Sequence, residues 1–408
     1  MHHCVFAAPF ALENTMRFVR ALLSLPHTRV AIVSQEPIER LPEDVRQSIA
    51  GFARVNDALD ADCLVGGVRE VARQLDRAVD SFFGILEQAQ VPIAEARAKL
   101  GLNGTSPAAA RNFRDKALMK DLLRENGLPC ARHELARNSF DALAAAARFG
   151  YPIVAKPPAG AGAKATVRAD SREQLESFLA TQAPTPNAPV LIEEFVKGRE
   201  FSFDSISVDG RHLFHSVCAY NPTPLEVVQT PWIQWCVLLP RELFVPELAA
   251  IHAAGPRALD VLGMGTGMSH MEWFRRPDGS IAISEVAARP PGAQFMSLLS
   301  WAHDADFYRL WARLMTRGEV EVPPRRFAAG AAYLRAQGDG EKVTAVHGIA
   351  DAQAELGELV VEARLPKVGQ ARSGSYEGEG YVIVRDENTK VVQHALERLV
   401  RLVQVRVD

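Results

Sequence analysis

Long apolar runs are missing from this chain of 408 residues, because no stretch of about 18 consecutive apolar residues occurs. The sequence therefore predicts no transmembrane helix. Its first residues also lack the basic start and long apolar core of a secretory signal peptide. We expect a cytoplasmic protein that makes no membrane contact.

An excess of basic residues is also missing. The chain has 46 Lys and Arg against 49 Asp and Glu, which gives a formal net charge of -3. No cluster of basic residues indicates a nucleic-acid face, so we expect no nucleic-acid partner. A local site for an anionic small molecule remains open.

Cysteines are few, and they do not form a metal-binding or disulfide pattern. The five cysteines are scattered and include no CxxC pair, so we expect reduced thiols. The sequence contains no Gly-Lys dipeptide, no HExxH and no GxSxG, which excludes a Walker A loop and two common hydrolase motifs. "GAGAKA" at 160–165 matches a permissive dinucleotide motif, but the residues after it are strand-like, whereas that motif opens a helix.

The remaining composition is that of an ordinary globular protein, with 48% apolar and 23% charged residues. Over residues 1–100, strand-like and helical patterns alternate, which predicts a parallel, doubly wound sheet. The pattern further predicts single helices over about 107–130 and about 300–316, and a hairpin at Asp209-Gly210. The fold class is therefore α/β, with α+β character in the later part.

A lysine beside a loop of small residues is the first candidate for chemistry. In "VAKPPAGAGAKAT", residues 154–166, Lys156 ends a strand and faces Gly160 and Gly162. Such a loop allows backbone N–H groups to approach phosphate oxygens, and the lysine neutralises their charge. Taken alone, the loop is also compatible with a plain hairpin connection.

Two acids and an arginine are the second candidate. Glu272 and Glu285 lie on two apolar strands, 269–275 and 280–286, which are joined by the turn "RPDG". Neighbouring carboxylates repel each other unless a cation lies between them, and Mg²⁺ prefers such oxygen ligands. Arg289 offers a planar fork for carboxylate or phosphate. The alternative is exposed strand-end acids with an ordinary salt bridge.

The order of these motifs resembles that of the ATP-grasp superfamily over most of the chain. "RNFRDKALMKDLLRENGLP" comes first, then the Lys156 loop, "VLIEEFVKGREF" at 190–201, and the Glu272, Glu285 and Arg289 group. The resemblance implies three parts: a doubly wound pre-ATP-grasp domain over 1–107, an ATP-grasp domain over 108–320 with a lid subdomain at about 120–195, and a C-terminal subdomain over 321–408.

The resemblance also implies a role for each matching residue. ATP is expected to be bound by Lys116, Lys156, Gly160, Gly162, Lys164, Glu193, Glu194, Val196 and Glu200. Glu272 and Glu285 are expected to hold Mg²⁺, or Mn²⁺ in its place. Arg289 and Lys156 are the expected catalytic residues, with Arg289 facing the reacting acyl phosphate.

The implied activity is ATP-dependent joining of a carboxylate, activated as an acyl phosphate, to an amine, which forms an amide, ADP and phosphate. "APFALENTMRFVRAL" and "HMEWF…EVAARPPG" are similar to bacterial L-amino acid ligases, which implies amino acid substrates. Many superfamily members have Asn where Ala287 stands, so the second metal position is open. A biotin carboxylase-like enzyme, another ATP-grasp ligase and a non-catalytic nucleotide-binding protein are the alternatives.

Two further residues are candidates for substrate contact. His270 lies two residues before Glu272, so strand alternation places both side chains on one face. Trp232 belongs to the aromatic segment "TPWIQWCVLLP" at 230–240, which is compatible with either an acceptor pocket or a core strand. A homodimer is expected from the family alone.

Overall fold

The computed structural model describes residues 1–160, 165–230 and 232–408. Its N-terminal region is a four-stranded sheet in the order β3-β2-β1-β4, and all three pairings are parallel. The predicted parallel, doubly wound sheet is thus confirmed. The elements of this region are β1 (His2–Ala7), α1 (Glu13–Leu23), β2 (Thr28–Ser34), α2 (Glu43–Ser48), β3 (Gly51–Arg54), α3 (Ala61–Leu75), β4 (Ser81–Phe83) and α4 (Gln90–Leu100).

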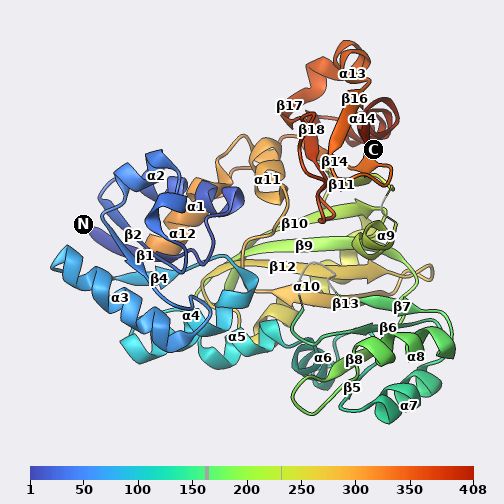
Figure 1. Cartoon of the computed structure of the whole chain (residues 1–408), viewed down its shortest axis with the longest axis horizontal. Helices are drawn as coiled ribbons and strands as arrows, with labels where there is room; N and C mark the ends of the chain where they lie inside the picture. The colour runs from blue at the N-terminus through green and yellow to red at the C-terminus, as the bar shows by residue number, and fades with distance from the viewer. Residues whose placement is uncertain (161–164, 231) are drawn as a thin grey trace.

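Alternation along β1 explains why this sheet carries helices on both faces. Cys4 and Phe6 belong to the apolar cluster that includes α1, whereas Val5 and Ala7 belong to the cluster that includes α3. The first of these clusters also contains Trp311, from a helix about 300 residues away in the chain. Figure 1 shows this helix, α12, among the blue N-terminal elements.

The predicted single helix at about 300–316 is wrong in one respect, because the segment forms two helices, α11 (Phe295–His303) and α12 (Phe307–Arg317). Asp304 has a left-handed conformation with φ of 49° and ends α11. The carboxylate of Asp306 then accepts a hydrogen bond from Arg309 N at 3.0 Å and begins α12.

The predicted helix at 107–130 is also divided, into α5 (Pro107–Arg114) and α6 (Lys116–Glu125). Asp115 is extended (φ -93°, ψ 107°), and its carboxylate accepts hydrogen bonds from Ala117 N and Leu118 N. A residue that caps one helix cannot also continue the preceding one. The break makes Lys116 the first residue of α6.

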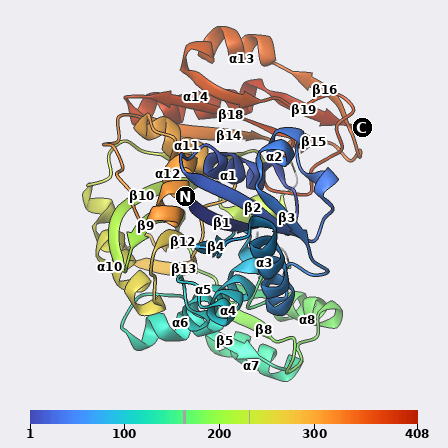
Figure 2. The same ribbon diagram turned by 90° about the vertical axis from the view of Figure 1, so that its left-hand side faces the viewer.

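The predicted lid subdomain, at about 120–195, contains its own four-stranded sheet in the order β5-β8-β6-β7, and the bounds of the subdomain stay a prediction. Two helices pack on this sheet through an apolar cluster that includes Leu175, Phe178 and Ile192. The elements are β5 (His133–Ala136), α7 (Ser139–Phe149), β6 (Ile153–Lys156), β7 (Val167–Ala169), α8 (Arg172–Thr181) and β8 (Val190–Glu194). Figure 2 shows the lid subdomain below the rest of the chain.

An eight-stranded antiparallel sheet in the order β13-β12-β9-β10-β11-β14-β18-β17 forms the centre of the molecule. The predicted hairpin at Asp209-Gly210 is confirmed, and both residues have positive φ. The remaining elements of this part are β9 (Arg199–Val208), β10 (Arg211–Asn221), α9 (Pro224–Gln229), β11 (Trp235–Leu239), α10 (Ala249–Leu262), β12 (Gly267–Arg275) and β13 (Ile281–Ala287).

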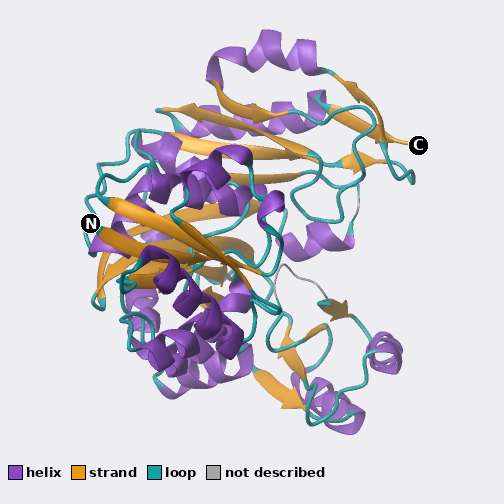
Figure 3. Cartoon of the chain, turned by 60° about the vertical axis from the view of Figure 1, so that its left-hand side comes forward, coloured by secondary structure: helices purple, strands orange, loops and turns teal. Residues whose placement is uncertain are grey.

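The last part of the chain completes this sheet with three strands and adds a small sheet in the order β15-β19-β16. Figure 3 shows helices covering the strands here. The elements are β14 (Ala328–Leu334), β15 (Ala336–Gln337), β16 (Val343–His347), α13 (Ile349–Leu356), β17 (Val360–Arg364), β18 (Gly380–Asp386), α14 (Thr389–Leu402) and β19 (Gln404–Val407). The boundaries near residues 107 and 320 stay predictions. In the described ranges, no helix is long and apolar enough to span a membrane.

Candidate active site

Residue alternation gives the central sheet one apolar and one polar face. Phe203 on β9 and Trp273 on β12 pack in the apolar cluster that includes α6 and α10. Asp204 is the partner of His270 across the same pair of strands, and Ser202 is the partner of Glu272. These polar residues therefore share the opposite face.

A cavity that is open to solvent lies over this polar face and reaches the lid subdomain. The predicted site residues that line it are Lys116, Lys156, Gly160, Glu193, Glu194, Val196, Glu200, His270, Glu272, Glu285 and Arg289. Gly162 and Lys164 lie outside the described residues. The sequence motifs, which are far apart along the chain, thus meet in one place.

Glu272 and Glu285 are direct partners across β12 and β13, next to a register shift between Glu272 and Trp273. The Nζ atom of Lys116 lies 2.8 Å from Glu285 Oε1 and donates a hydrogen bond to Gly160 O at 2.9 Å. Burial opposes ionisation of Glu285, but the charges of Lys116 and Lys156 outweigh it and lower its pKa. Glu285 is therefore a carboxylate at neutral pH.

These two acids fit a divalent cation by the chemistry of their donors. They are two adjacent carboxylates, and the ammonium of Lys116 already places a positive charge on one of them. Within ranges 1–160, 165–230 and 232–408, His, Cys, Asp and Glu form no group of three or more that could hold a metal. A bound Mg²⁺ would thus take its other ligands from phosphate oxygens and water.

A buried chain of charges lies beneath the lid strands. Glu193 lies between Lys156, at 2.9 Å, and Lys120, at 3.3 Å. Burial alone would raise the pKa of Glu193, but the two ammonium groups lower it to about 2. Sequence reasoning missed Lys120, although it follows Lys116 by one helical turn. The predicted contact of Glu193 with ATP stays a prediction.

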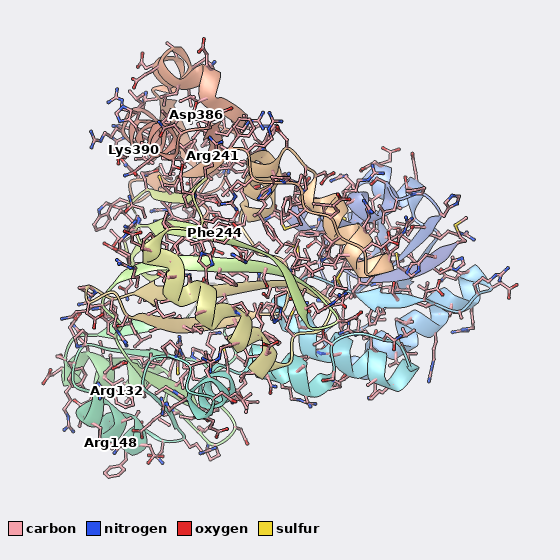
Figure 4. The ribbon with its side chains drawn as sticks, turned by 180° about the vertical axis from the view of Figure 1, so that it is seen from behind. Arg132, Arg148, Arg241, Phe244, Asp386 and Lys390 are labelled. Carbon is pink, nitrogen blue, oxygen red and sulfur yellow. The ribbon has the colours of Figure 1, made fainter. Side chains whose placement is uncertain are left out.

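Glu194 has a different environment, although it is the next residue along β8. Its carboxylate pairs with Arg132 at 2.7 Å and with Arg276 at 3.2 Å. Arg132 lies on the lid subdomain (Figure 4), whereas Arg276 lies in the turn between β12 and β13. The side chain of Glu194 thus connects the lid to the central sheet. The predicted contact of Glu194 with ATP stays a prediction.

A carboxylate of the N-terminal region fixes the side chain of Arg289. Its Nε forms an ion pair with the carboxylate of Glu87, and Nη1 donates to Pro290 O at 2.9 Å. Burial disfavours the charge on Arg289, but Glu87 outweighs burial and raises the pKa of the guanidinium. No local sequence pattern indicated Glu87, which precedes Arg289 by about 200 residues.

His270 is held by an acid that sequence reasoning also missed. Its Nδ1 lies 2.5 Å from Asp204 Oδ1, and its Nε2 lies 3.7 Å from Glu272 Oε1. Burial opposes the charge, but Asp204 and Glu272 raise the pKa of His270 to about 9. The predicted common face of His270 and Glu272 is confirmed. Strand alternation was the only available signal for Asp204.

The placement of Trp232 in the cavity is wrong. Its side chain is 66% exposed and lines a separate groove with Val228 and Arg335. The aromatic residue of this segment that does line the cavity is Trp235. Trp235 begins β11 and faces the polar side of the sheet, whereas Trp232 precedes the strand.

Comparison with known proteins shows what the chain is similar to. Residues 121–300 match the ATP-grasp domain. The chain is 26% identical over 201 residues to the L-arginine-specific L-amino acid ligase of Bacillus subtilis. That alignment covers 48% of this chain and 48% of the ligase, so it spans about half the length of this relative.

Solved structures share the fold over the full length. An L-amino acid ligase from Bacillus licheniformis superposes with a TM-score of 0.80 and 18% identity, covering 100% of this chain and 99% of that one. The biotin carboxylase domain of Hydrogenobacter thermophilus 2-oxoglutarate carboxylase, in complex with MgADP and bicarbonate, superposes with a TM-score of 0.69 and 14% identity. This superposition covers 98% of this chain and 90% of that one. This chain thus shares its fold with these solved structures, and its residues 121–300 carry the match to the ATP-grasp domain.

Proposed function

We propose that the protein is an ATP- and Mg²⁺-dependent, ADP-forming ligase that joins the carboxylate of one amino acid to the amine of another. One observation carries the proposal. Lys116, Lys156, Glu272, Glu285 and Arg289 line a single cavity, with the two acids directly opposite each other. The similarity to two L-amino acid ligases supports the choice of amino acids as substrates.

The first step is attack of a carboxylate oxygen of the substrate on the γ-phosphorus of ATP, which breaks the bond to the ADP oxygen and forms an acyl phosphate. Negative charge spreads over the transferred group. Lys156 and Arg289 stabilise this charge because both are buried cations at the cavity wall. When bound by Glu272 and Glu285, Mg²⁺ supplies charge neutralisation on the phosphates.

The second step is attack of the amine nitrogen on the acyl carbon. Phosphate leaves, and the nitrogen loses a proton, so that an amide results. An acyl phosphate reacts readily with water, and the site must exclude water until the amine arrives. The lid subdomain, connected through Glu194 to Arg132 and Arg276, is the element that covers the nucleotide.

Phosphate release from MgATP tests the proposal, measured against single amino acids and pairs of them, with mass spectrometry of the products. We expect ADP, phosphate and a dipeptide mass, all dependent on the pair. Phosphate and ADP formed with bicarbonate alone would support the carboxylase alternative. ATP binding without turnover under any pair would contradict the ligase assignment.

A further inference from the structure

The cavity has a second half that the nucleotide and metal residues do not occupy. It is lined by four aromatic side chains, here named the aromatic box: Tyr220 on β10, Trp235 on β11, Phe295 on α11 and Tyr376 in the loop before β18. Leu225 on α9 lines the same cavity. On this face of the sheet, the acids thus lie on β12 and β13, and two of the aromatic residues lie on β10 and β11.

The aromatic box is a rigid apolar surface. The ring of Trp235 lies 4.9 Å from Tyr376 and 5.9 Å from Tyr220, and the ring of Tyr220 lies 5.9 Å from Phe295. Behind Trp235, the buried ring of Tyr333 stacks at 4.5 Å. Side chains fixed by such packing offer preformed contact area to an apolar ligand.

The aromatic box also begins beside the reacting groups. The ring of Phe295 lies 5.5 Å from that of His270, whose Nε2 is 3.7 Å from Glu272. Arg289 lines the same cavity. A substrate carboxylate bound at Arg289 would thus have its side chain within reach of the box.

The aromatic box itself offers no negative charge to pair with a basic side chain. The cavity-lining carboxylates are Glu193, Glu194, Glu200, Glu272 and Glu285. All five lie with the nucleotide and metal residues. Glu377, next to Tyr376, is not among the lining residues. The aromatic faces attract a cation, but burial of an ammonium or guanidinium group without a paired carboxylate costs more than that attraction returns.

We infer that the acid activated by this enzyme is an amino acid with a large apolar or aromatic side chain, held by Tyr220, Trp235, Phe295 and Tyr376 beside Arg289. The inference rests on the proposed ligase function. It separates this chain from the arginine-specific ligase of Bacillus subtilis to which its sequence is similar.

The test is the specificity constant for phosphate release with MgATP, with one small amine partner held constant and the acid varied. We expect Phe, Leu and Met to exceed Arg, Lys and Asp by roughly tenfold to a hundredfold, the effect of burying such a side chain. Fragment-ion masses of the dipeptide then show the apolar residue as the donor of the carboxyl group. A preference for Arg or Asp, or an apolar residue found only as the amine donor, would overturn the inference.

A pair of variants on α9 sharpens the test. Leu225→Asp places a carboxylate in the cavity wall and is expected to raise the Arg-to-Phe ratio of specificity constants roughly tenfold. Val228→Asp adds the same charge to the same helix but lines the separate groove, and it should leave the ratio unchanged. Equal ratios in both variants would contradict the assignment of the box.

The experiments distinguish a failure of the ligase proposal from a failure of the inference about the aromatic box. ADP and dipeptide formed mainly from charged acids would remove the aromatic box from substrate selection and leave the ligase function intact. A lack of ADP with every acid and amine would overturn the ligase function, and the inference that depends on it would be wrong as well.

Discussion

Lys120 is completely buried, yet it carries a charge next to the nucleotide end of the cavity. Its Nζ donates to Ser284 O at 2.8 Å and lies 3.3 Å from Glu193, which also pairs with Lys156. Burial lowers the pKa of Lys120, and Glu193 opposes that shift. Glu193 thus divides its charge between two lysines. Loss of Lys120 would leave Lys156 as the only one of these two lysines paired with Glu193.

Lys120→Met should therefore weaken ATP binding and stability together. One oxygen of Glu193 loses its ion-pair partner, which costs about 1–3 kcal/mol of unfolding free energy. Lys156 is then the only lysine of the two that pairs with Glu193, and we expect this pair to become tighter. We expect the KM for ATP to rise more than kcat falls. Steady-state kinetics and urea unfolding measure the two effects.

A double variant separates this electrostatic effect from a simple loss of packing. Lys120→Met with Glu193→Gln removes two of the three buried charges, and the loss of stability should be smaller than the sum of the two single losses, because Glu193→Gln alone leaves both lysines without their partner. Lys99→Met, at an exposed lysine on α4, is the matched control. Strictly additive losses in the double variant would contradict a balancing role.

Glu285→Gln should abolish turnover while the fold is retained. The substitution keeps the shape of the side chain but removes a charge from the pair with Glu272 and from the contact with Lys116. We expect the phosphate-release rate to fall at least ~100-fold, with the melting temperature little changed. Glu125→Gln, at an exposed acid that ends α6, should retain full activity. A fully active Glu285→Gln variant would remove this residue from the metal site.

Site residues were predictable where local sequence carried the signal. Glu272, Glu285 and Lys156 each lie at the end of a short apolar run, and the order of their motifs is itself informative. Asp204, Glu87 and Tyr376 carry no such signal. Tyr376 reaches the cavity on a loop near the end of the chain, whereas Asp204 and Glu87 contact the cavity residues His270 and Arg289 from behind. The error at Trp232 arose because the sequence did not indicate where β11 begins.

A helix boundary positions Lys116, whereas Lys156 lies at the end of the strand β6. Lys116 is the first residue of α6 only because Asp115 ends α5 and caps the next helix. Periodicity alone predicted one helix across this point, since apolar residues continue on both sides. The same holds for Asp304 and Asp306 between α11 and α12. Capping acids within a periodic stretch were the signal for both breaks.

Asp115→Ala should reduce activity by displacing Lys116. The loss of two hydrogen bonds to Ala117 N and Leu118 N costs about 1 kcal/mol of stability. We also expect a severalfold rise in the KM for ATP, because the lysine at the helix start becomes less fixed. Asn138→Ala removes a similar cap from α7 of the lid subdomain. A comparable loss of stability in that variant, without the KM effect, is the expected control result.

Helix α12 connects the N-terminal region to the rest of the chain. It follows the central strands in the sequence but packs on the N-terminal sheet. Trp311 on this helix lies 6.2 Å from Phe6 and 4.9 Å from Phe18, ring to ring, and is 2% exposed. The same apolar cluster continues to Trp235 and Tyr333 of the central sheet. Since Glu87 of the N-terminal region forms an ion pair with Arg289, this docking also positions the residue that we propose to be catalytic.

Trp311→Ala should therefore separate the N-terminal region from the rest of the molecule. Removal of the buried indole costs about 3–5 kcal/mol, and the loss falls on contacts shared by both regions. We expect residues 1–105 to become sensitive to limited proteolysis before the central sheet unfolds in urea, and activity to fall with it. Trp311→Phe, which keeps part of the contact, should be intermediate. Phe178→Ala, in the separate core of the lid subdomain, should leave the protection of residues 1–105 unchanged. If Trp311→Ala also leaves that protection unchanged, α12 does not hold the two regions together, and Arg289 must be positioned by Glu87 alone.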